Sequence, residues 1–257
     1  MIRMSIIEFP KFAGMRLSAT AALAMLVCLS LPCGAQTPSS GSNKPEDSSS
    51  LRSETLPSPS SSVGEEKARA LNKEGATFLT QGKPREAAES FRNAILANPQ
   101  SAAAHNNLAL VLKEMGQLQE AEKEARLALK IRGDKGSYHF NLGLILQRQN
   151  KQAEAEGCFR EALKMDPMDP DAHYRLALSL LNLSKPAEAE QECKLAILMK
   201  PNDSSLHKVL ADALLQEKKY DAALCEYRTT LELDPQGHDL GDIKNKIDFL
   251  KQVLNSR

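Results

Sequence analysis

Apolar residues recur three and four positions apart along most of the chain, which is the spacing of one face of an α-helix. The stretch from Gly136 to Pro167 shows the pattern best. It carries one apolar face at His139, Leu142, Gly143 and Leu146, and another at Ala155, Phe159, Ala162 and Leu163. A short polar segment at residues 149–152 separates the two faces, and Asp166 is disfavoured in a helix because a proline follows it. The stretch therefore predicts two antiparallel helices joined by a tight turn.

This two-helix pattern repeats at a fixed period of 34 residues. One position is always small, and the residues there are Gly75, Ala109, Gly143, Ala177 and Ala211. A second position is always alanine, at Ala87, Ala121, Ala155, Ala189 and Ala223. A third is proline at Pro99, Pro167, Pro201 and Pro235, with Gly133 as the exception. The sequence thus predicts five helix-turn-helix units without insertions, at about residues 68–101, 102–135, 136–169, 170–203 and 204–237.

A helix-turn-helix period of this length, with these small and proline positions, resembles the tetratricopeptide repeat. Phe91, Phe159 and Tyr227 stand at the aromatic position of that family, whereas Ala125 and Cys193 are smaller there. The resemblance covers residues 67–236 and implies an all-α fold, a right-handed superhelical solenoid with a protein-binding function. After the last unit, residues 238–257 carry one apolar stripe, which predicts a helix that caps the open end of the solenoid.

The N-terminal 35 residues have the features of a signal peptide. Leu17 to Leu31 is an uncharged apolar run of 15 residues, too short for a membrane span and suited to the hydrophobic core of an export signal. Ala35 is small enough to precede a cleavage site. We therefore expect an exported protein, periplasmic or extracellular, with no integral membrane domain once the signal is removed. An uncleaved anchor is the alternative, and either Met1 or Met15 fits as the initiator.

Residues 36–66 are rich in serine and proline and poor in large apolar side chains. Such a segment cannot bury enough surface to offset the entropy lost on ordering. We predict a disordered linker here, which separates the export signal from the repeats.

Composition excludes several classes of function. The formal net charge is zero, so the chain offers no bulk positive charge for nucleic acid. It contains no HExxH, GxSxG, P-loop or GxGxxG motif, and we expect neither an enzyme nor a bound cofactor. Three cysteines lie in the repeats, Cys158, Cys193 and Cys225, and the absence of a CxxC pair favours a fold that does not depend on disulfides.

Four histidines share one repeat position: His105, His139, His173 and His207. A row of histidines raises the alternative of a metal- or haem-binding protein. Equivalent residues of neighbouring units are about two helix packing distances apart, each about 8–10 Å. A zinc ion needs its nitrogen ligands at about 2.0–2.1 Å. The spacing therefore favours a packing role for the histidines.

The resemblance also implies a concave groove lined by the first helix of each unit. The residues that it places on the wall are Asn106, Asn107, Leu110, Phe140, Asn141, Leu144, Tyr174, Arg175, Leu178 and Lys208. Asn107, Asn141 and Arg175 occupy the same repeat position in successive units, and amides can pair with the backbone of an extended peptide. The same amides can instead serve packing between helices, and the wall can be a solvated face without a ligand.

These observations predict an exported, non-catalytic scaffold that binds protein or an extended peptide in its groove. A structural adaptor of the cell envelope, acting through its linker or the solenoid ends, is the second hypothesis. The sequence specifies neither the partner nor the oligomeric state.

Overall fold

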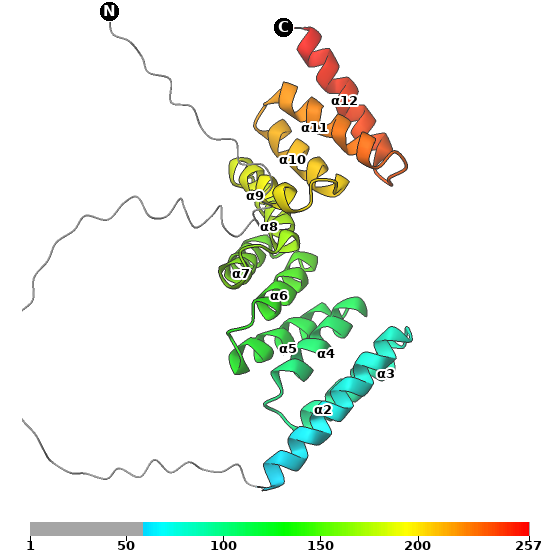
Figure 1. The fold of residues 1–257 in the computed structure, drawn as a ribbon, viewed down its shortest axis with the longest axis vertical. Helices are drawn as coiled ribbons and strands as arrows, with labels where there is room; N and C mark the ends of the chain where they lie inside the picture. The colour runs from blue at the N-terminus through cyan, green and yellow to red at the C-terminus, as the bar shows by residue number, and fades with distance from the viewer. Residues whose placement is uncertain (1–58, 257) are drawn as a thin grey trace, which may run out of the picture. The chain divides into compact units, whose positions relative to one another are not determined.

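The computed structural model describes residues 59–256, which belong to one compact unit within Thr55–Arg257. The predicted signal peptide (1–35) and most of the predicted linker lie outside the described residues. The described helices follow one another in the order α2 (Pro59–Thr80), α3 (Pro84–Ala97), α4 (Ala102–Glu114), α5 (Leu118–Ile131), α6 (Gly136–Arg148), α7 (Gln152–Met165), α8 (Pro170–Asn182), α9 (Pro186–Met199), α10 (Ser204–Gln216), α11 (Tyr220–Leu233) and α12 (Leu240–Asn255) (Figure 1).

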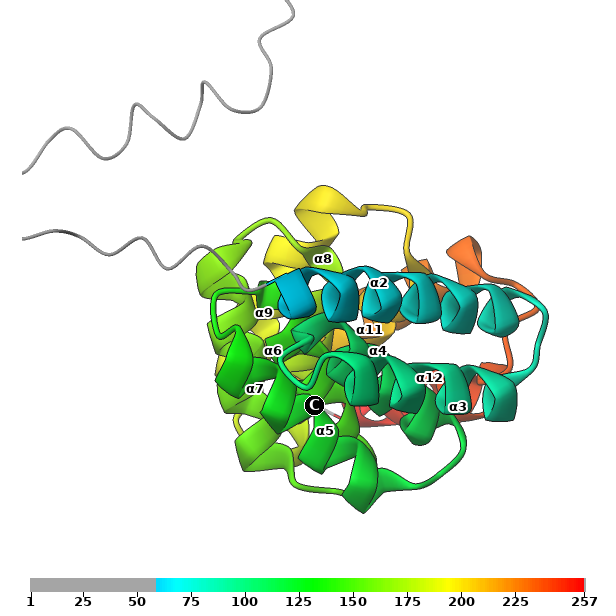
Figure 2. The ribbon, with the colours of Figure 1, turned by 90° about the horizontal axis from the view of Figure 1, so that it is seen from below.

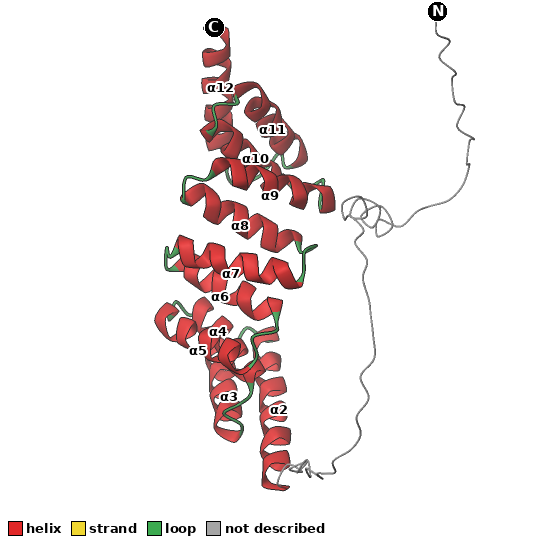
Figure 3. Ribbon diagram, turned by 90° about the vertical axis from the view of Figure 1, so that its left-hand side faces the viewer, coloured by secondary structure: helices red, strands yellow, loops and turns green. Residues whose placement is uncertain are grey.

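The helices pair and stack along the chain. Each even-numbered helix from α2 to α10 packs antiparallel to the next helix, and each odd-numbered helix also packs against the first helix of the following unit (Figure 3). The backbones of even-numbered helices of neighbouring units come close to one another, whereas those of the described odd-numbered helices do not and are joined by side-chain ion pairs, as Arg160 on α7 is to Glu188 on α9 at 2.5 Å. The even-numbered helices therefore lie on the inner, more tightly curved side. The predicted all-α solenoid of five units with a terminal helix is confirmed.

The two helices of a unit meet where the sequence has its small residue. A Cβ placed on Gly75 would lie 2.6 Å from Cε1 of Phe91, and the same distance separates a Cβ on Gly143 from Cε1 of Phe159. Both phenylalanines are fully buried. Glycine thus leaves room for the phenyl ring in these two units, whereas unit five has Ala211 and Tyr227 at the two equivalent positions.

The turn inside each unit has the same backbone conformation every 34 residues. The residues with positive φ are Gly82, Gly116, Asn150, Ser184 and Lys218. The N–H after each of them donates to a carbonyl five residues back, as Lys219 does to Leu214 at 2.9 Å. This is the bond that closes a helix through a left-handed residue, and it directs the chain back along the first helix.

The terminal helix α12 covers the last repeat unit. Its residues Ile243, Ile247 and Leu250 are buried in the same core cluster as the repeats. Lys246 Nζ lies 2.8 Å from Oδ1 of Asp212 on α10, and that carboxylate also accepts a hydrogen bond from the Tyr227 hydroxyl on α11. Apolar contacts and this polar cluster together fix the helix on the end of the solenoid.

The linker predicted over residues 36–66 is too long, because α2 begins at Pro59. The first turns of α2 lie against the end of α3 (Figure 2), where a Cβ on Gly64 would come within 2.8 Å of the Ala97 carbonyl oxygen. Glu65 also forms an ion pair with Arg69 one turn later, at 3.4 Å. This packing outweighs the weak helix propensity of the serine-rich sequence.

Across residues 59–256, no helix has the length and apolar character needed to cross a membrane.

Candidate peptide-binding groove

Four of the predicted groove residues surround one hollow on the inner side. Phe140 and Leu144 come from α6, and Tyr174 and Arg175 come from α8. The hollow has a volume of about 340 Å³. Its other lining residues are Pro170, Asp171, Lys200, Asp203 and Leu206. The hollow is therefore shared by the first helices of units three, four and five.

The floor of this hollow is anchored in the core. The Phe140 ring packs edge to face on the buried Phe159, with ring centroids 5.7 Å apart. Tyr174 is half-buried, and burial raises the pKa of its hydroxyl. The guanidinium of Arg175 lies over the Tyr174 ring, 5.4 Å from the ring centroid. The hollow thus combines aromatic and aliphatic surface with one stacked cation.

A second hollow, of about 370 Å³, lies further along α8. The predicted groove residue Leu178 lines it together with Leu181 and with Leu215 of α10. Its polar residues are Asn182, Asp212, Gln216 and Lys246, the last of these from α12. Because α8 and α10 border both hollows, the two form successive parts of the same inner wall.

The asparagine side chains bond to one another instead of standing free. Asn141 Nδ2 donates to Asn106 Oδ1 at 2.9 Å, and Asn107 Nδ2 donates to Asn72 Oδ1 at 3.0 Å. A longer contact of 3.4 Å joins Asn106 Nδ2 to Asn107 Oδ1. The amides therefore form a chain from unit three back to unit one, which is the packing role left open by the sequence.

The hydrogen-bonded amides correct the expectation that Asn106 lines the groove. Asn106 is buried, with only 7% of its surface exposed. A side chain enclosed by two neighbouring amides cannot meet a ligand directly. Asn107, Asn141 and Leu110 remain half-buried on the inner helices. Sequence reasoning missed Asn72, although Asn72 lies 34 residues before Asn106 and so shares its repeat position.

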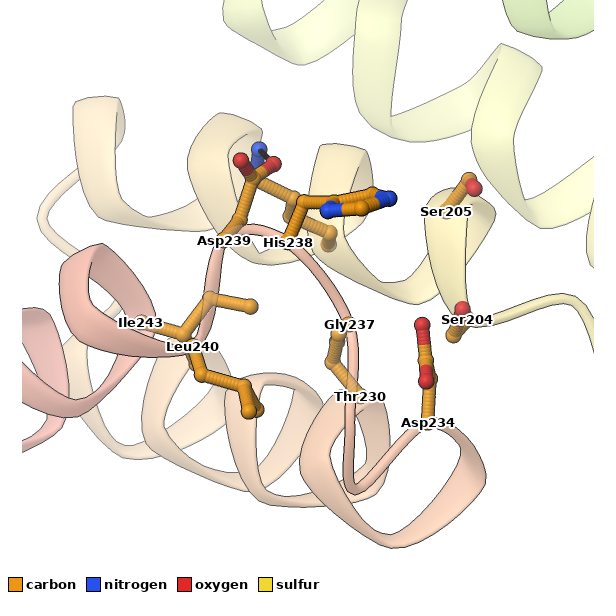
Figure 4. Close-up of a pocket in the computed structure, with 10 residues that line it drawn as sticks. Ser204, Ser205, Thr230, Asp234, Gly237, His238, Asp239, Leu240 and Ile243 are labelled. Carbon is orange, nitrogen blue, oxygen red and sulfur yellow. Dashed lines mark hydrogen bonds and ion pairs between the residues drawn. The ribbon is translucent and has the colours of Figure 1, made fainter.

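Lys208 also has a partner within the chain, since its ammonium bonds to the carboxylate of Asp239 just before α12. Both residues line a smaller hollow of about 190 Å³ between α10 and α12 (Figure 4). Ser204, Asp234 and His238 line it too. The predicted groove cation at this position is therefore used to attach the terminal helix.

Several lining residues of the first hollow were not found from the sequence. Pro170 and Asp171 begin α8, and Asp203 and Leu206 lie at the start of α10. Each comes within five residues of the proline that ends the preceding unit. Their short distance from this proline is the sequence feature that could have identified them as lining residues.

Three of the four aligned histidines share one hydrogen-bonding arrangement. Nδ1 of His105, His173 and His207 lies 2.6–2.7 Å from a glutamate on the second helix of the same unit. Their Nε2 atoms lie 2.9–3.1 Å from the carbonyl oxygen of the proline that ends the preceding unit. Each ring thus joins both helices of a unit to the unit before.

His139 differs, because Cys158 stands where the other units have glutamate, and only its bond to the Gly133 carbonyl remains. Within residues 59–256, no cluster of three or more histidine, cysteine, aspartate or glutamate side chains is arranged to hold a metal ion.

Two of the three cysteines of the repeats lack the environment of reactive thiols. Burial raises the pKa of Cys193 to about 12 and that of Cys158 to about 11. Cys225 is exposed on α11. All three are free thiols.

Comparison with known proteins identifies the repeat. Residues 100–168 and residues 140–205 each match a family model described as tetratricopeptide repeat. No curated protein matches the chain.

Several solved structures share the fold at low sequence identity. MamA from Desulfovibrio magneticus RS-1 is 17% identical with a TM-score of 0.63, and the match covers 67% of this chain and 98% of that one. PilF of Pseudomonas aeruginosa is 24% identical with a TM-score of 0.60, covering 75% and 92% of the two chains. YrrB, described as a TPR protein with an unusual peptide-binding site, is 16% identical with a TM-score of 0.63, covering 70% and 93%.

Proposed function

Because this chain belongs to the tetratricopeptide repeat family, we propose that it is a non-catalytic scaffold that binds an extended segment of a protein along the inner wall of its solenoid. The hollow between α6, α8 and α10 is the observation that carries the proposal. It offers apolar surface for a side chain and polar groups at its rim, which is the usual make-up of a binding site.

Further support comes from the rigidity of the wall. Phe140 is held by Phe159, and the neighbouring first helices are linked by Gln147, whose Nε2 donates to the Arg175 carbonyl at 3.0 Å and to Ser179 Oγ at 2.9 Å. A preformed wall lowers the entropy cost of binding, because fewer side chains have to be ordered when the ligand arrives.

The asparagine side chains of the inner wall also have hydrogen-bonding groups for a ligand. Asn141 uses one N–H on Asn106, which leaves its other N–H and its carbonyl oxygen for a ligand. Asn107 keeps one N–H in the same way. These groups are placed to bond the backbone of an extended peptide that continues from the hollow toward unit two. The peptide-binding description of YrrB is consistent with this use of the fold.

The test is selection of a displayed library of random 12-residue peptides on the immobilised protein, followed by affinity measurements on the selected peptides. Tyr174→Ala should weaken their binding by roughly tenfold or more, since it removes an aromatic contact worth about 1.4 kcal/mol or above. Leu198→Ala is the matched control, because Leu198 lies on α9 with 81% of its surface exposed. Peptides that bind the Tyr174→Ala variant as tightly as the parent contradict the proposal.

We further propose that the scaffold acts outside the cytoplasm. The support is the uncharged run from Leu17 to Leu31 followed by Ala35, which lies outside the described residues. N-terminal sequencing of protein recovered from the exported fraction should begin at Gln36. A full-length chain confined to the cytoplasm contradicts export and leaves the groove unaffected.

A further inference from the structure

Arg175 differs from the other arginine of the repeats that is partly buried. Arg160 bonds to Glu156 at 3.0 Å and to Glu188 at 2.5 Å, and those pairs raise its pKa. Arg175 has no carboxylate within ion-pair distance in residues 59–256. Its guanidinium faces the first hollow and stacks on Tyr174.

The other charged groups of the hollow are already engaged. Lys200 Nζ bonds to Asp171 Oδ1 at 2.7 Å. Asp203 caps α10 by accepting a hydrogen bond from the Ser205 N–H at 3.0 Å. Of the two cations that line the hollow, Arg175 is therefore the one without a carboxylate partner, and a planar guanidinium is the side chain best suited to a carboxylate.

We infer that the peptide bound in the groove carries an acidic side chain that pairs with Arg175, and an aliphatic side chain two residues away that enters the second hollow. This inference rests on the proposed function and specifies its ligand. The acidic residue is inferred from the positive charge of Arg175. The aliphatic residue is inferred from the leucines that line the second hollow.

The spacing follows from the geometry of α8. Arg175 lines the first hollow and Leu178 and Leu181 line the second, three and six residues further along the helix. A rise of about 1.5 Å per residue puts them about 5–9 Å beyond Arg175. An extended peptide advances about 3.3 Å per residue and turns every second side chain to the same side, so a peptide that follows α8 reaches the second hollow with the side chain two residues away.

The experiment repeats the library selection with the full chain and with Arg175→Asn. Asparagine occupies the same repeat position in units two and three, at Asn107 and Asn141, so the substitution fits the fold. The parent protein should enrich aspartate or glutamate two positions from leucine, isoleucine or methionine. The Arg175→Asn variant should keep the aliphatic preference and lose the acidic one.

Affinity measurements on individual selected peptides then show how much the contact with Arg175 contributes to binding. Replacing the acidic residue of a selected peptide by its amide should weaken binding to the parent by roughly tenfold, as expected for a charge-assisted hydrogen bond. The same replacement should change binding to Arg175→Asn by less than about twofold. Arg160→Asn is the matched control, since it makes the same substitution in a partly buried arginine of α7 that does not line either hollow, and its selection should equal that of the parent.

The outcomes separate the two proposals. Selected peptides that depend on Tyr174 but show no acidic preference overturn the inference and leave the groove intact. An acidic preference that survives in Arg175→Asn also overturns it, because another cation must then supply the contact. Selection that yields no peptide dependent on Tyr174 overturns the proposed function and the inference together.

Discussion

Gly143 on α6 and Phe159 on α7 are complementary in size, because a methyl group on the glycine would lie 2.6 Å from the edge of the phenyl ring. The same pairing joins Gly75 to Phe91, whereas unit two has Ala109 and the smaller Ala125 at these two positions. In units one and three the glycine is thus matched to the phenylalanine sixteen positions later, whereas unit five pairs Ala211 with Tyr227. This relationship governs how closely the two helices of a unit approach.

Replacing Gly143 by alanine should destabilise unit three despite the better helix propensity of alanine. Overpacking a well-filled core costs about 1–3 kcal/mol, and the propensity gain offsets at most about 1 kcal/mol. Hydrogen exchange of α6 and α7 measures the effect locally.

The control for this substitution is Gly157→Ala on α7, where a Cβ would meet no atom within 4 Å. That variant should gain up to about 1 kcal/mol of stability. Adding Phe159→Cys to Gly143→Ala recreates the residue pair of unit four, Ala177 and Cys193, and should show a favourable coupling energy in a double-mutant cycle. Strictly additive effects would contradict the size relationship.

Lys218 holds a left-handed conformation, with φ of 61°, at the turn position that is glycine in the first two units. A residue with a side chain pays about 1–2 kcal/mol in this conformation. Lys218→Gly should therefore stabilise unit five by about 0.5–1 kcal/mol, after the greater chain entropy of glycine in the unfolded state is subtracted. Thermal unfolding of Lys218→Gly and of Gly116→Ala, each compared with the parent, measures the effect. Gly116→Ala should lower stability, whereas Lys218→Gly should raise it.

Asn141→Ala should lower stability as well as ligand binding. The side chain bonds to Asn106 across the junction of units two and three, and Asn106 is buried, so its carbonyl oxygen loses a partner. A lost hydrogen bond of this kind costs about 0.5–1.5 kcal/mol. Faster amide exchange in α4 and α6, with α10 unchanged, is the expected pattern. Unaltered exchange in all three helices would show that the amide chain contributes no stability.

The His173 ring should titrate above its ordinary pKa. Burial lowers the pKa of this imidazole, but the Glu192 carboxylate and the Pro167 carbonyl both accept from it and raise the pKa overall. Since the folded pKa exceeds the unfolded value, this contribution to stability is fully present below the unfolded pKa of about 6.5 and is lost as pH rises through the folded pKa.

Proton NMR of the ring across pH 5–9 measures the shift, and Glu192→Gln should lower the pKa of His173. The same variant should flatten the decline in unit four's stability over the pH range in which the parent ring deprotonates. If Glu192→Gln leaves the pKa of His173 unchanged, the Glu192 carboxylate is not the cause of the raised pKa.

The three repeat cysteines should react in the order of their exposure. At pH 8, iodoacetamide should modify Cys225 first, Cys158 slowly and Cys193 only after unfolding. The thiols of Cys158 and Cys193 have pKa values of about 11 and 12, so few thiolates form, and Cys193 is also fully enclosed. Peptide mapping by mass spectrometry resolves the three sites. Rapid labelling of Cys193 in the folded protein would contradict its burial.

The period of 34 residues by itself determined the helix pairs and their order. Small residues such as Gly143, the alanines at Ala155 and its equivalents, and the prolines at unit ends are local requirements of helix contact and turn geometry, so each leaves its mark in the sequence. The terminal helix followed in the same way, because its stripe at Ile243, Ile247 and Leu250 has the helical spacing. These features depend on neighbours that are close in sequence, which is why a periodic pattern suffices to predict them.

Only the tertiary structure decided which inner side chains remain available to a ligand. Asn106 and Lys208 occupy wall positions in the repeat pattern, yet Asn106 is buried beside Asn141, and Lys208 is bonded to Asp239. Arg175 has the same repeat position as Asn141, and it is left without an acidic partner because Asp171 is bonded to Lys200 and Asp203 caps α10. Such pairings join residues of different units in three dimensions, and the start of α2 at Pro59 likewise depends on the close contact of Gly64 with α3. The repeat pattern places these wall residues on the inner helices but does not show which side chains bond to one another, although the two amide pairs share a spacing of 35 residues.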